Sequence, residues 1–376
     1  MLEQINIKEP NSQFVSQFFH PNLLQSKPYK LELENNLIKL DQNESPFDWP
    51  ADIKKEITQA LCQEPWNTYP QDYPQKLKEA LALSLNISPE NIILSPGSNY
   101  HITVLLNMFA TRGSSNKIII TRPSFPLFEG HCRYQNIPYE VWPLNKNFEY
   151  DLTLLPKLTP GSCVFFASPN NPVGNSLKKK DLVSLLEKNP DCYFIADEAY
   201  WEFSEQNMIE LLQKFSNLLI VRTFSKAMGS AGIRFSYILA SKILCEQIKK
   251  NTLPFIINKF TSIAMTTALK NKEFMSQIKT NVNYLKKEKE KIYNYLQKKN
   301  YSDFFHVINS QTNFLCFVCK SESILQKIQM SLKEHKIIIR NVSGAGLPQT
   351  LRVTIGKKED NMRVLNILDS LFERES

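Results

Sequence analysis

Short apolar runs alternate with segments of helical periodicity from about residue 50 to residue 255, and this alternation constrains the fold most strongly. Strands that alternate with helices favour an α/β domain built on a mostly parallel sheet. The expected strands cover residues 117–121, 163–167, 193–196, 218–221 and 237–240. The expected helices cover 77–85 and 182–187, and another begins at Ser98 or Asn99, with Ile102, Leu105, Leu106 and Phe109 on one face.

The pattern changes after about residue 260. A long charged helix is expected at 282–299, a second helix at 324–334 and a third from about residue 360. Strand-like runs cover 314–318, 337–339 and 351–355, which together predict a smaller α+β domain. We therefore expect an N-terminal arm at 1–45 that joins the small domain, a large domain at 46–258 and a small domain at 259–376.

The composition is that of an ordinary globular protein. Of the 376 residues, 42% are hydrophobic and 22% are charged, and the formal net charge is +8. A nucleic-acid-binding protein would concentrate this charge in a patch. The densest run, 286–291, is interleaved with glutamates, which predicts the solvated face of a helix. A mild positive charge suits small anionic ligands such as phosphates and carboxylates.

Cysteine usage indicates a reducing compartment, and we expect a cytoplasmic protein. Seven cysteines are scattered along the chain, an odd number. The close pair Cys316 and Cys319 lies in a strand-like run without a second pair of ligands, so no metal site is expected. The N-terminal segment lacks the pattern of a signal peptide. We find no window of 18 apolar residues, so no membrane association is expected.

The strongest chemical signal is the segment 223–232, Thr-Phe-Ser-Lys-Ala-Met-Gly-Ser-Ala-Gly, which is followed by Arg234. The amine of Lys226 can form a Schiff base with an aldehyde cofactor if it loses its proton. The hydroxyls of Thr223 and Ser225 and the guanidinium of Arg234 suit a phosphate dianion. The alternative is a surface lysine on an ordinary strand-to-loop segment.

A second signal is the apolar run that ends at Asp197 and is followed by Tyr200. The carboxyl end of a strand is where open α/β sheets bind ligands. Asp197 can pair with a protonated pyridine nitrogen and so keep the ring an electron sink. Tyr200 can form a hydrogen bond with the phenolic oxygen of such a ring. A lone aspartate more often caps a helix, and that alternative remains for Asp197.

Three further segments follow predicted strands or precede a predicted helix. Asn171, in the turn 168–174, is a candidate donor to the phenolic oxygen. Gly97 and Ser98 precede the helix near residue 100, and helix N-termini bind phosphate. The ring of Phe125 can stack on a pyridine face, although an aromatic residue at a strand end is more often part of the core.

Taken in order, these segments resemble the fold-type-I aminotransferases that use pyridoxal 5′-phosphate (PLP), specifically the class-II group that contains histidinol-phosphate aminotransferase. The resemblance covers roughly residues 40 to 356. Its elements are 40–47, 69–70, 95–99, 122–125, 168–174, 197–200, 223–234, 312–314 and 351–356.

The resemblance implies PLP as cofactor and a role for each matching residue. Lys226, Asp197 and Tyr200 would be catalytic. The cofactor would be held by these three and by Ser98, Asn99, Phe125, Asn171, Thr223, Ser225 and Arg234, with Tyr69 reaching the phosphate from the neighbouring subunit of a homodimer. The substrate would be bound by Arg352 through its acidic group, by Asn171, and, on weaker matches, by Arg340 and Tyr29.

The expected reaction is amino transfer between a small-molecule donor and a 2-oxo acid, with histidinol phosphate and 2-oxoglutarate as the specific pair. Asn99, Ser236, Gln42 and Ser45 depart from the usual family pattern, which leaves the donor open. The alternatives are an aromatic-amino-acid aminotransferase and a decarboxylase of a phosphorylated amino acid. A PLP-binding sensor domain without activity is disfavoured, because Lys226 and Asp197 are both present.

Overall fold

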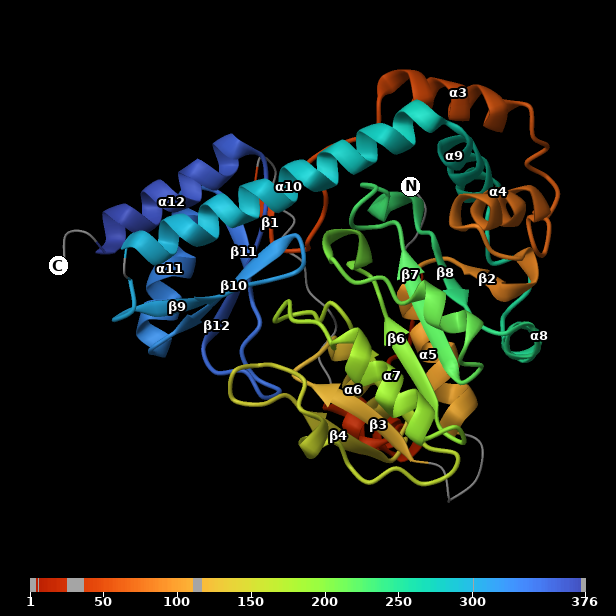
Figure 1. Cartoon of the computed structure of the whole chain (residues 1–376), viewed down its shortest axis with the longest axis horizontal. Helices are drawn as coiled ribbons and strands as arrows, with labels where there is room; N and C mark the ends of the chain where they lie inside the picture. The colour runs from red at the N-terminus through yellow and green to blue at the C-terminus, as the bar shows by residue number, and fades with distance from the viewer. Residues whose placement is uncertain (1–4, 6, 26–36, 111–116, 300, 373–376) are drawn as a thin grey trace.

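A computed structural model describes residues 5, 7–25, 37–110, 117–299 and 301–372 of the chain. Two β-sheets organise this part, a larger one on the right of Figure 1 and a smaller one on the left. The prediction of an α/β fold with a large, mostly parallel sheet and a smaller α+β part is confirmed.

The large sheet has the strand order β2-β8-β7-β6-β5-β3-β4. In chain order its strands are β2 (Ile92–Ser95), β3 (Ile118–Arg122), β4 (Tyr139–Pro143), β5 (Cys163–Ala167), β6 (Tyr193–Asp197), β7 (Leu218–Thr223) and β8 (Ser236–Leu239). All neighbours are parallel except β8, which runs antiparallel to both β7 and β2. The carboxyl ends of the other six strands therefore lie at one edge of the sheet.

The central strands are apolar along most of their length because both faces of the sheet are covered, and their polar residues come at the carboxyl ends. In β5, Val164 and Phe166 belong to one hydrophobic cluster, and Cys163 and Phe165 belong to the other. The covering helices are α3 (Ala51–Cys62), α4 (Gln75–Leu85), α5 (Ser98–Ala110), α6 (Pro126–Tyr134), α7 (Lys179–Lys188), α8 (Lys242–Lys250) and α9 (Lys259–Lys270). The predicted start and buried face of α5 are confirmed.

Short 3-10 turns connect several of these elements. They are η1 (Pro89–Asn91), η2 (Leu152–Leu154), η3 (Trp201–Phe203), η4 (Ile209–Gln213) and η5 (Ala231–Ile233). Of these, η3 follows β6 after residues 198–200, and η5 precedes β8.

The small sheet has the order β1-β11-β12-β10-β9. Its strands are β1 (Ile38–Leu40), β9 (Phe305–Ile308), β10 (Phe314–Cys319), β11 (Ile337–Asn341) and β12 (Thr350–Thr354), accompanied by α11 (Glu322–Glu334) and α12 (Lys358–Phe372). β1, from the predicted N-terminal arm, pairs in parallel with β11. Helix α9 lies beyond the predicted boundary at residue 258, yet it packs against α3 and α4, which lie in the predicted large domain. The domain boundaries therefore stay predictions.

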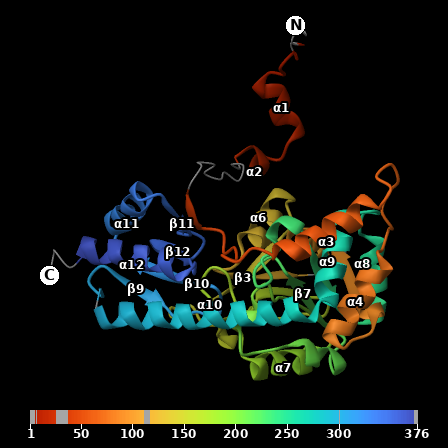
Figure 2. The same cartoon turned by 90° about the horizontal axis from the view of Figure 1, so that it is seen from above.

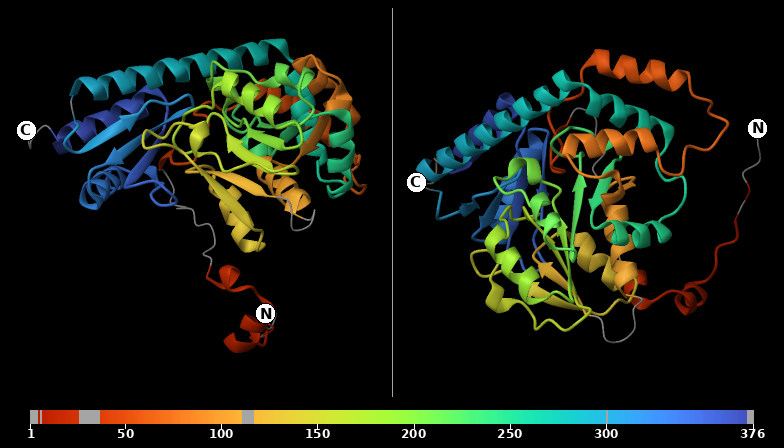
Figure 3. Two further views of the ribbon diagram at one scale, coloured as in Figure 1. Left: turned by 60° about the horizontal axis from the view of Figure 1, so that its bottom comes forward. Right: turned by 45° about the vertical axis from the view of Figure 1, so that its right-hand side comes forward.

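Helix α10 (Lys272–Lys299) has 28 residues and runs alongside both sheets (Figure 3). The predicted start at Val282 is wrong, because Phe274 and Ile278 extend the buried stripe toward the N-terminus. The prediction that 286–291 forms a solvated face is also wrong in part. Lys289 is buried, and its Nζ donates to the carbonyl oxygens of Ser310 and Thr312. These bonds give hydrogen-bond donors to two carbonyl oxygens in the loop between β9 and β10.

Helices α1 (Ser12–Phe18) and α2 (Pro21–Leu24) lie at the N-terminal end, and α1 stands away from both sheets (Figure 2). The α2 segment is tied to α6, because Nδ2 of Asn22 donates to the carbonyl oxygen of Arg133 at 3.2 Å. Among the described residues, no helix is both long enough and apolar enough to cross a membrane.

Candidate active site

The predicted site segments meet at the carboxyl edge of the large sheet, where the small sheet adjoins it. Asp197 ends β6 and Thr223 ends β7, and these two strands are parallel neighbours. The turns that contain Asn171 and Phe125 follow β5 and β3 at the same edge. This edge is where parallel sheets bind their ligands, because strand ends and helix starts expose unpaired polar groups there.

Lys226 lies in the turn after β7, and its Nζ donates to the carbonyl oxygen of Gln42 at 2.8 Å. Burial, helped by the nearby charge of Arg352, lowers the pKa of Lys226 to about 8. A substantial fraction of the amine is therefore neutral near physiological pH, as covalent chemistry at this nitrogen requires.

Asp197 is 5% exposed, and its Oδ1 accepts a hydrogen bond from the backbone N–H of Ala199 at 3.0 Å. This bond is local to the turn, and Asp197 does not cap the 3-10 helix that follows, whose N-cap is Tyr200. Burial raises the pKa of Asp197 to about 7. Within the described residues no salt bridge neutralises this carboxylate, so its second oxygen suits a cationic N–H donor.

Tyr200 is held by Asn43, whose side-chain Nδ2 donates to the tyrosine oxygen at 2.8 Å. Asn43 has a left-handed backbone, with φ of 56°, and its carbonyl oxygen accepts from Nδ2 of Asn313 at 3.0 Å. We predicted no role for Asn43. The signal that could have found it is an asparagine three residues after the end of a strand, since asparagine tolerates the left-handed conformation better than most residues.

Arg352 joins three parts of the chain. Its Nη1 donates to Oδ1 of Asn171 at 2.6 Å, and its Nη2 donates to the carbonyl oxygen of Asp41 at 2.7 Å. Arg340 is its partner across the antiparallel strands β11 and β12, so both side chains leave the small sheet on the same face. The structure therefore brings Arg352 and Asn171 together, with Arg340 beside them.

The predicted phosphate residues form a second group. Oγ1 of Thr223 lies 2.9 Å from Oγ of Ser225 and 2.9 Å from the carbonyl oxygen of Phe235. Gly97 has φ of 107°, and a Cβ on it would lie 2.3 Å from Nη2 of Arg234. Only glycine permits this approach between backbone and guanidinium. Ser98 then begins α5, so its helix N-terminus faces this cradle.

Three further predicted residues that the structure describes make none of the contacts given above. Tyr69 is 80% exposed and stacks on Phe255, with ring centroids 5.0 Å apart. Asn99 is exposed on the first turn of α5. Phe125 is half-buried and packs edge-on against Phe128 at 6.2 Å. Tyr29 lies outside the described residues.

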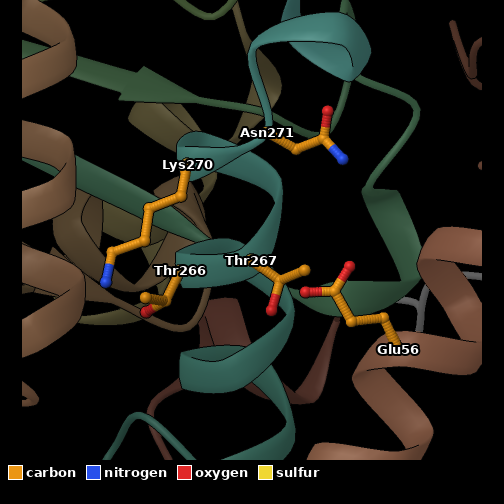
Figure 4. Close-up of a pocket in the computed structure, with 5 residues that line it drawn as sticks. All are labelled: Glu56, Thr266, Thr267, Lys270 and Asn271. Carbon is orange, nitrogen blue, oxygen red and sulfur yellow. The ribbon is translucent and has the colours of Figure 1, made fainter.

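A separate surface hollow of about 390 Å³ lies between α3 and α9 (Figure 4). It is lined by Glu56, Thr266, Thr267, Lys270 and Asn271. Neither helix supplies any of the side chains described above, so this hollow is distinct from the site around Lys226.

The residues present fit PLP. The buried carboxylate of Asp197 matches a protonated ring nitrogen, and the cradle of Gly97, Arg234 and the Thr223 and Ser225 hydroxyls matches a phosphate. The Lys226 amine, whose pKa is lowered to about 8 so that a fraction of it is neutral, matches an aldehyde. This donor set and the two-sheet fold define the class of fold-type-I PLP-dependent transferases.

The chain belongs to the aminotransferases of class I and II: the sequence model described as "Aminotransferase class I and II" matches residues 35–368. The protein is therefore an enzyme that transfers an amino group between small molecules, with PLP as its cofactor.

Curated relatives and solved structures agree with this family. A histidinol-phosphate aminotransferase of Pyrococcus furiosus is 33% identical, over 93% of this chain and 97% of the relative. The structure of histidinol-phosphate aminotransferase from Sinorhizobium meliloti in complex with PLP superposes with a TM-score of 0.80 at 23% identity, over 94% and 98% of the two chains. An L-threonine-O-3-phosphate decarboxylase from Porphyromonas gingivalis reaches 0.75 at 21% identity, over 90% and 100%. At these identities both structures support the fold alone.

Proposed function

We propose that this aminotransferase moves an amino group between histidinol phosphate, or a related donor, and 2-oxoglutarate. The observation that carries the proposal is the pair Arg340 and Arg352 on one face of the small sheet, with Arg352 close enough to the Lys226 amine for its charge to lower the pKa of that amine. Two guanidinium groups suit two substrates that each bring an acidic group to the same place. Relatives at about one-third identity, over nearly the whole chain, bear the name of this activity.

In this proposal the side chains of the site divide the work between them. Lys226 attaches the cofactor and later carries the proton that leaves the substrate Cα. Asp197 holds the proton on the ring nitrogen, and Tyr200 and Asn171 hold the phenolic oxygen. PLP, when bound, supplies the electron sink for the bond broken at Cα. The phosphate is bound by Ser98, Asn99, Thr223, Ser225 and Arg234, while Phe125 covers one face of the ring.

Arg352 binds the acidic group of the substrate. Its guanidinium already donates to a carbonyl oxygen and to the Asn171 amide, so its plane is fixed before a substrate arrives. A fixed guanidinium loses less conformational freedom when it binds a carboxylate or phosphate in a bidentate manner. Arg340, and Tyr29 from the N-terminal arm, would complete this subsite.

The assembly proposed is a homodimer in which Tyr69 reaches the neighbouring site. Tyr69 and Trp66 are 80% and 76% exposed in the single chain, and the Tyr69 ring stacks on Phe255, which leaves an aromatic surface available to a second copy. A cytoplasmic location is proposed from cysteine usage, since none of the seven cysteines, all of which the structure describes, is in a disulfide.

The test is the absorption spectrum of the PLP-loaded protein after addition of single amino donors without an oxo acid. Conversion to the pyridoxamine form with histidinol phosphate, but not with phenylalanine, would support the proposed donor. Conversion with phenylalanine alone would make the enzyme an aromatic-amino-acid aminotransferase. Carbon dioxide release from threonine phosphate, with the PLP spectrum unchanged, would replace amino transfer with decarboxylation.

A further inference from the structure

A buried ion pair lies directly behind the proposed cofactor site. The carboxylate oxygen Oε2 of Glu198 is 2.7 Å from Nε and 2.6 Å from Nη2 of Arg222. The side chains are 2% and 1% exposed. Nη2 of Arg222 also donates to Oδ1 of Asn207 at 2.9 Å, and the guanidinium lies 4.1 Å from the centroid of the Trp201 ring. Arg222 is thus held in one orientation by three neighbours.

The turn after β6 divides its side chains between two tasks. Asp197 and Tyr200 belong to the proposed cofactor site, whereas Glu198 and Trp201 contact Arg222. The backbone continues the link, because the N–H of Glu198 donates to the carbonyl oxygen of Val221 at 2.8 Å. Any movement of the Arg222 side chain is therefore transmitted to the turn that carries Asp197.

The same arginine is coupled to the other half of the site through its own backbone. Arg222 immediately precedes Thr223, whose side chain contacts Ser225 in the phosphate group, and Lys226 follows in that turn. The ion pair thus joins the end of β6, which carries Asp197, to the end of β7, which leads to Lys226. A single ligand that contacts the ends of both β6 and β7 requires these two strand ends to stay at a fixed distance from each other.

Among the described ionisable groups around Arg222, Glu198 is the one that forms an ion pair with it. Burial raises the pKa of Glu202 to about 8 and that of Tyr237 above its usual range, so both are mainly neutral near pH 7. Burial also raises the pKa of Glu198, but the charge and hydrogen bond of Arg222 oppose that rise. A buried ion pair is seldom a net source of stability, since desolvation offsets the attraction and apolar replacements are often tolerated. The ion pair is therefore better explained by the way it fixes the positions of the groups around it than by a gain in stability.

We propose, on the basis of the proposed function, that Glu198 and Arg222 are positioning residues that hold Asp197 and Lys226 at the separation required to act on one cofactor ring. Neither side chain contacts the cofactor or the substrate. Both act through the turn after β6 and the turn after β7.

The main test is the double variant Glu198→Gln with Arg222→Met, which removes both charges together and leaves no unpaired buried ion. We expect it to fold and bind PLP, with kcat lowered about 10- to 100-fold, as expected for displaced reacting groups. The pH titration midpoint of the bound PLP absorbance should move with it. If the double variant does not fold, Arg222→Lys, which keeps the charge but loses the forked contact, is measured for the same two changes.

The matched control is Asn217→Ala. Asn217 ties the opposite end of the same two strands, since its Nδ2 donates to the carbonyl oxygens of Asn189 and Cys192 at 3.1 and 3.0 Å. This variant should lower Tm yet keep the wild-type kcat and absorbance midpoint. The proposal is overturned if the double variant keeps both wild-type values, or if Asn217→Ala changes them equally. Failure of the wild-type protein to bind PLP would instead refute the proposed function.

Discussion

The backbone of Gly97 lies against the guanidinium of Arg234, so closely that a Cβ on the glycine would be 2.3 Å from Nη2. The two residues come from β2–α5 and from the turn before β8, and together they form one wall of the proposed phosphate cradle. This contact makes Gly97 a sensitive probe of cofactor binding.

Gly97→Ala is expected to weaken PLP binding at least tenfold, because the methyl group displaces Arg234 and strains a backbone with φ of 107°. Equilibrium dialysis with PLP measures the effect. Gly232→Ala is the matched control, since its Cβ would meet no atom within 4 Å. Equal affinity of the two variants would remove Gly97 and Arg234 from the phosphate site.

Lys226→Ala is expected to abolish turnover, since both attachment of the cofactor and proton transfer at Cα need this amine. The variant should still bind PLP without covalent attachment, so borohydride reduction should no longer fix the cofactor to the protein. Mass spectrometry of the reduced protein, beside a coupled assay, measures both effects. Appreciable amino transfer by this variant would count heavily against the assignment.

Arg352→Ala should mainly raise KM for acidic substrates, by an amount that corresponds to about 2 kcal/mol, or roughly 30-fold. The loss is larger than that of one neutral hydrogen bond because a charge-assisted contact disappears. The exposed Arg133→Ala variant controls for the change in net charge. Unchanged kinetics across a panel of donors would exclude Arg352 from the substrate subsite.

Asp197 should make the stability of the PLP-free protein depend on pH. Its pKa is raised by burial from 3.8 to about 7, so the folded state holds a proton that the unfolded state releases. The stabilisation is therefore complete below pH 3.8 and is lost as pH rises toward 7.

Urea unfolding of wild type and Asp197→Asn between pH 4 and pH 8 measures this contribution. The difference in unfolding free energy should decline with rising pH by up to about 4 kcal/mol, because the amide does not titrate. Parallel curves for the two proteins would show that the carboxyl group titrates normally in the folded state.

The sequence located most segments of the site because each one ends a strand of a parallel sheet. Asp197 and Thr223 follow apolar runs that could be recognised from hydrophobicity alone, and parallel pairing of β6 with β7 then places both at one edge. The two edge strands of the large sheet, β4 and β2, were not predicted, because the apolar run is interrupted in one and is shorter than four residues in the other. β4 contains Glu140 and ends at a proline, and β2 has only four residues.

The contacts of Asn43 and Lys289 could not be predicted, because their partners are distant in sequence. Asn43 reaches Tyr200 only after β1 has joined the small sheet, and no local periodicity encodes that pairing. Lys289 lies in a run of lysines and glutamates that is typical of a solvated helix, yet it supplies donors to a loop 21 and 23 residues further along. In both cases the contacts depend on how distant parts of the chain pack together.

The pairing of Ile38 with Ile337 also has a consequence during synthesis on the ribosome. The first strand of the small sheet emerges about 300 residues before its partner, which corresponds to tens of seconds at usual rates of translation. Throughout that interval β1 is an unpaired edge, and residues 41–43, which contact Lys226, Tyr200 and Arg352, have no fixed position. The nascent chain can thus complete its large sheet well before it is competent for catalysis.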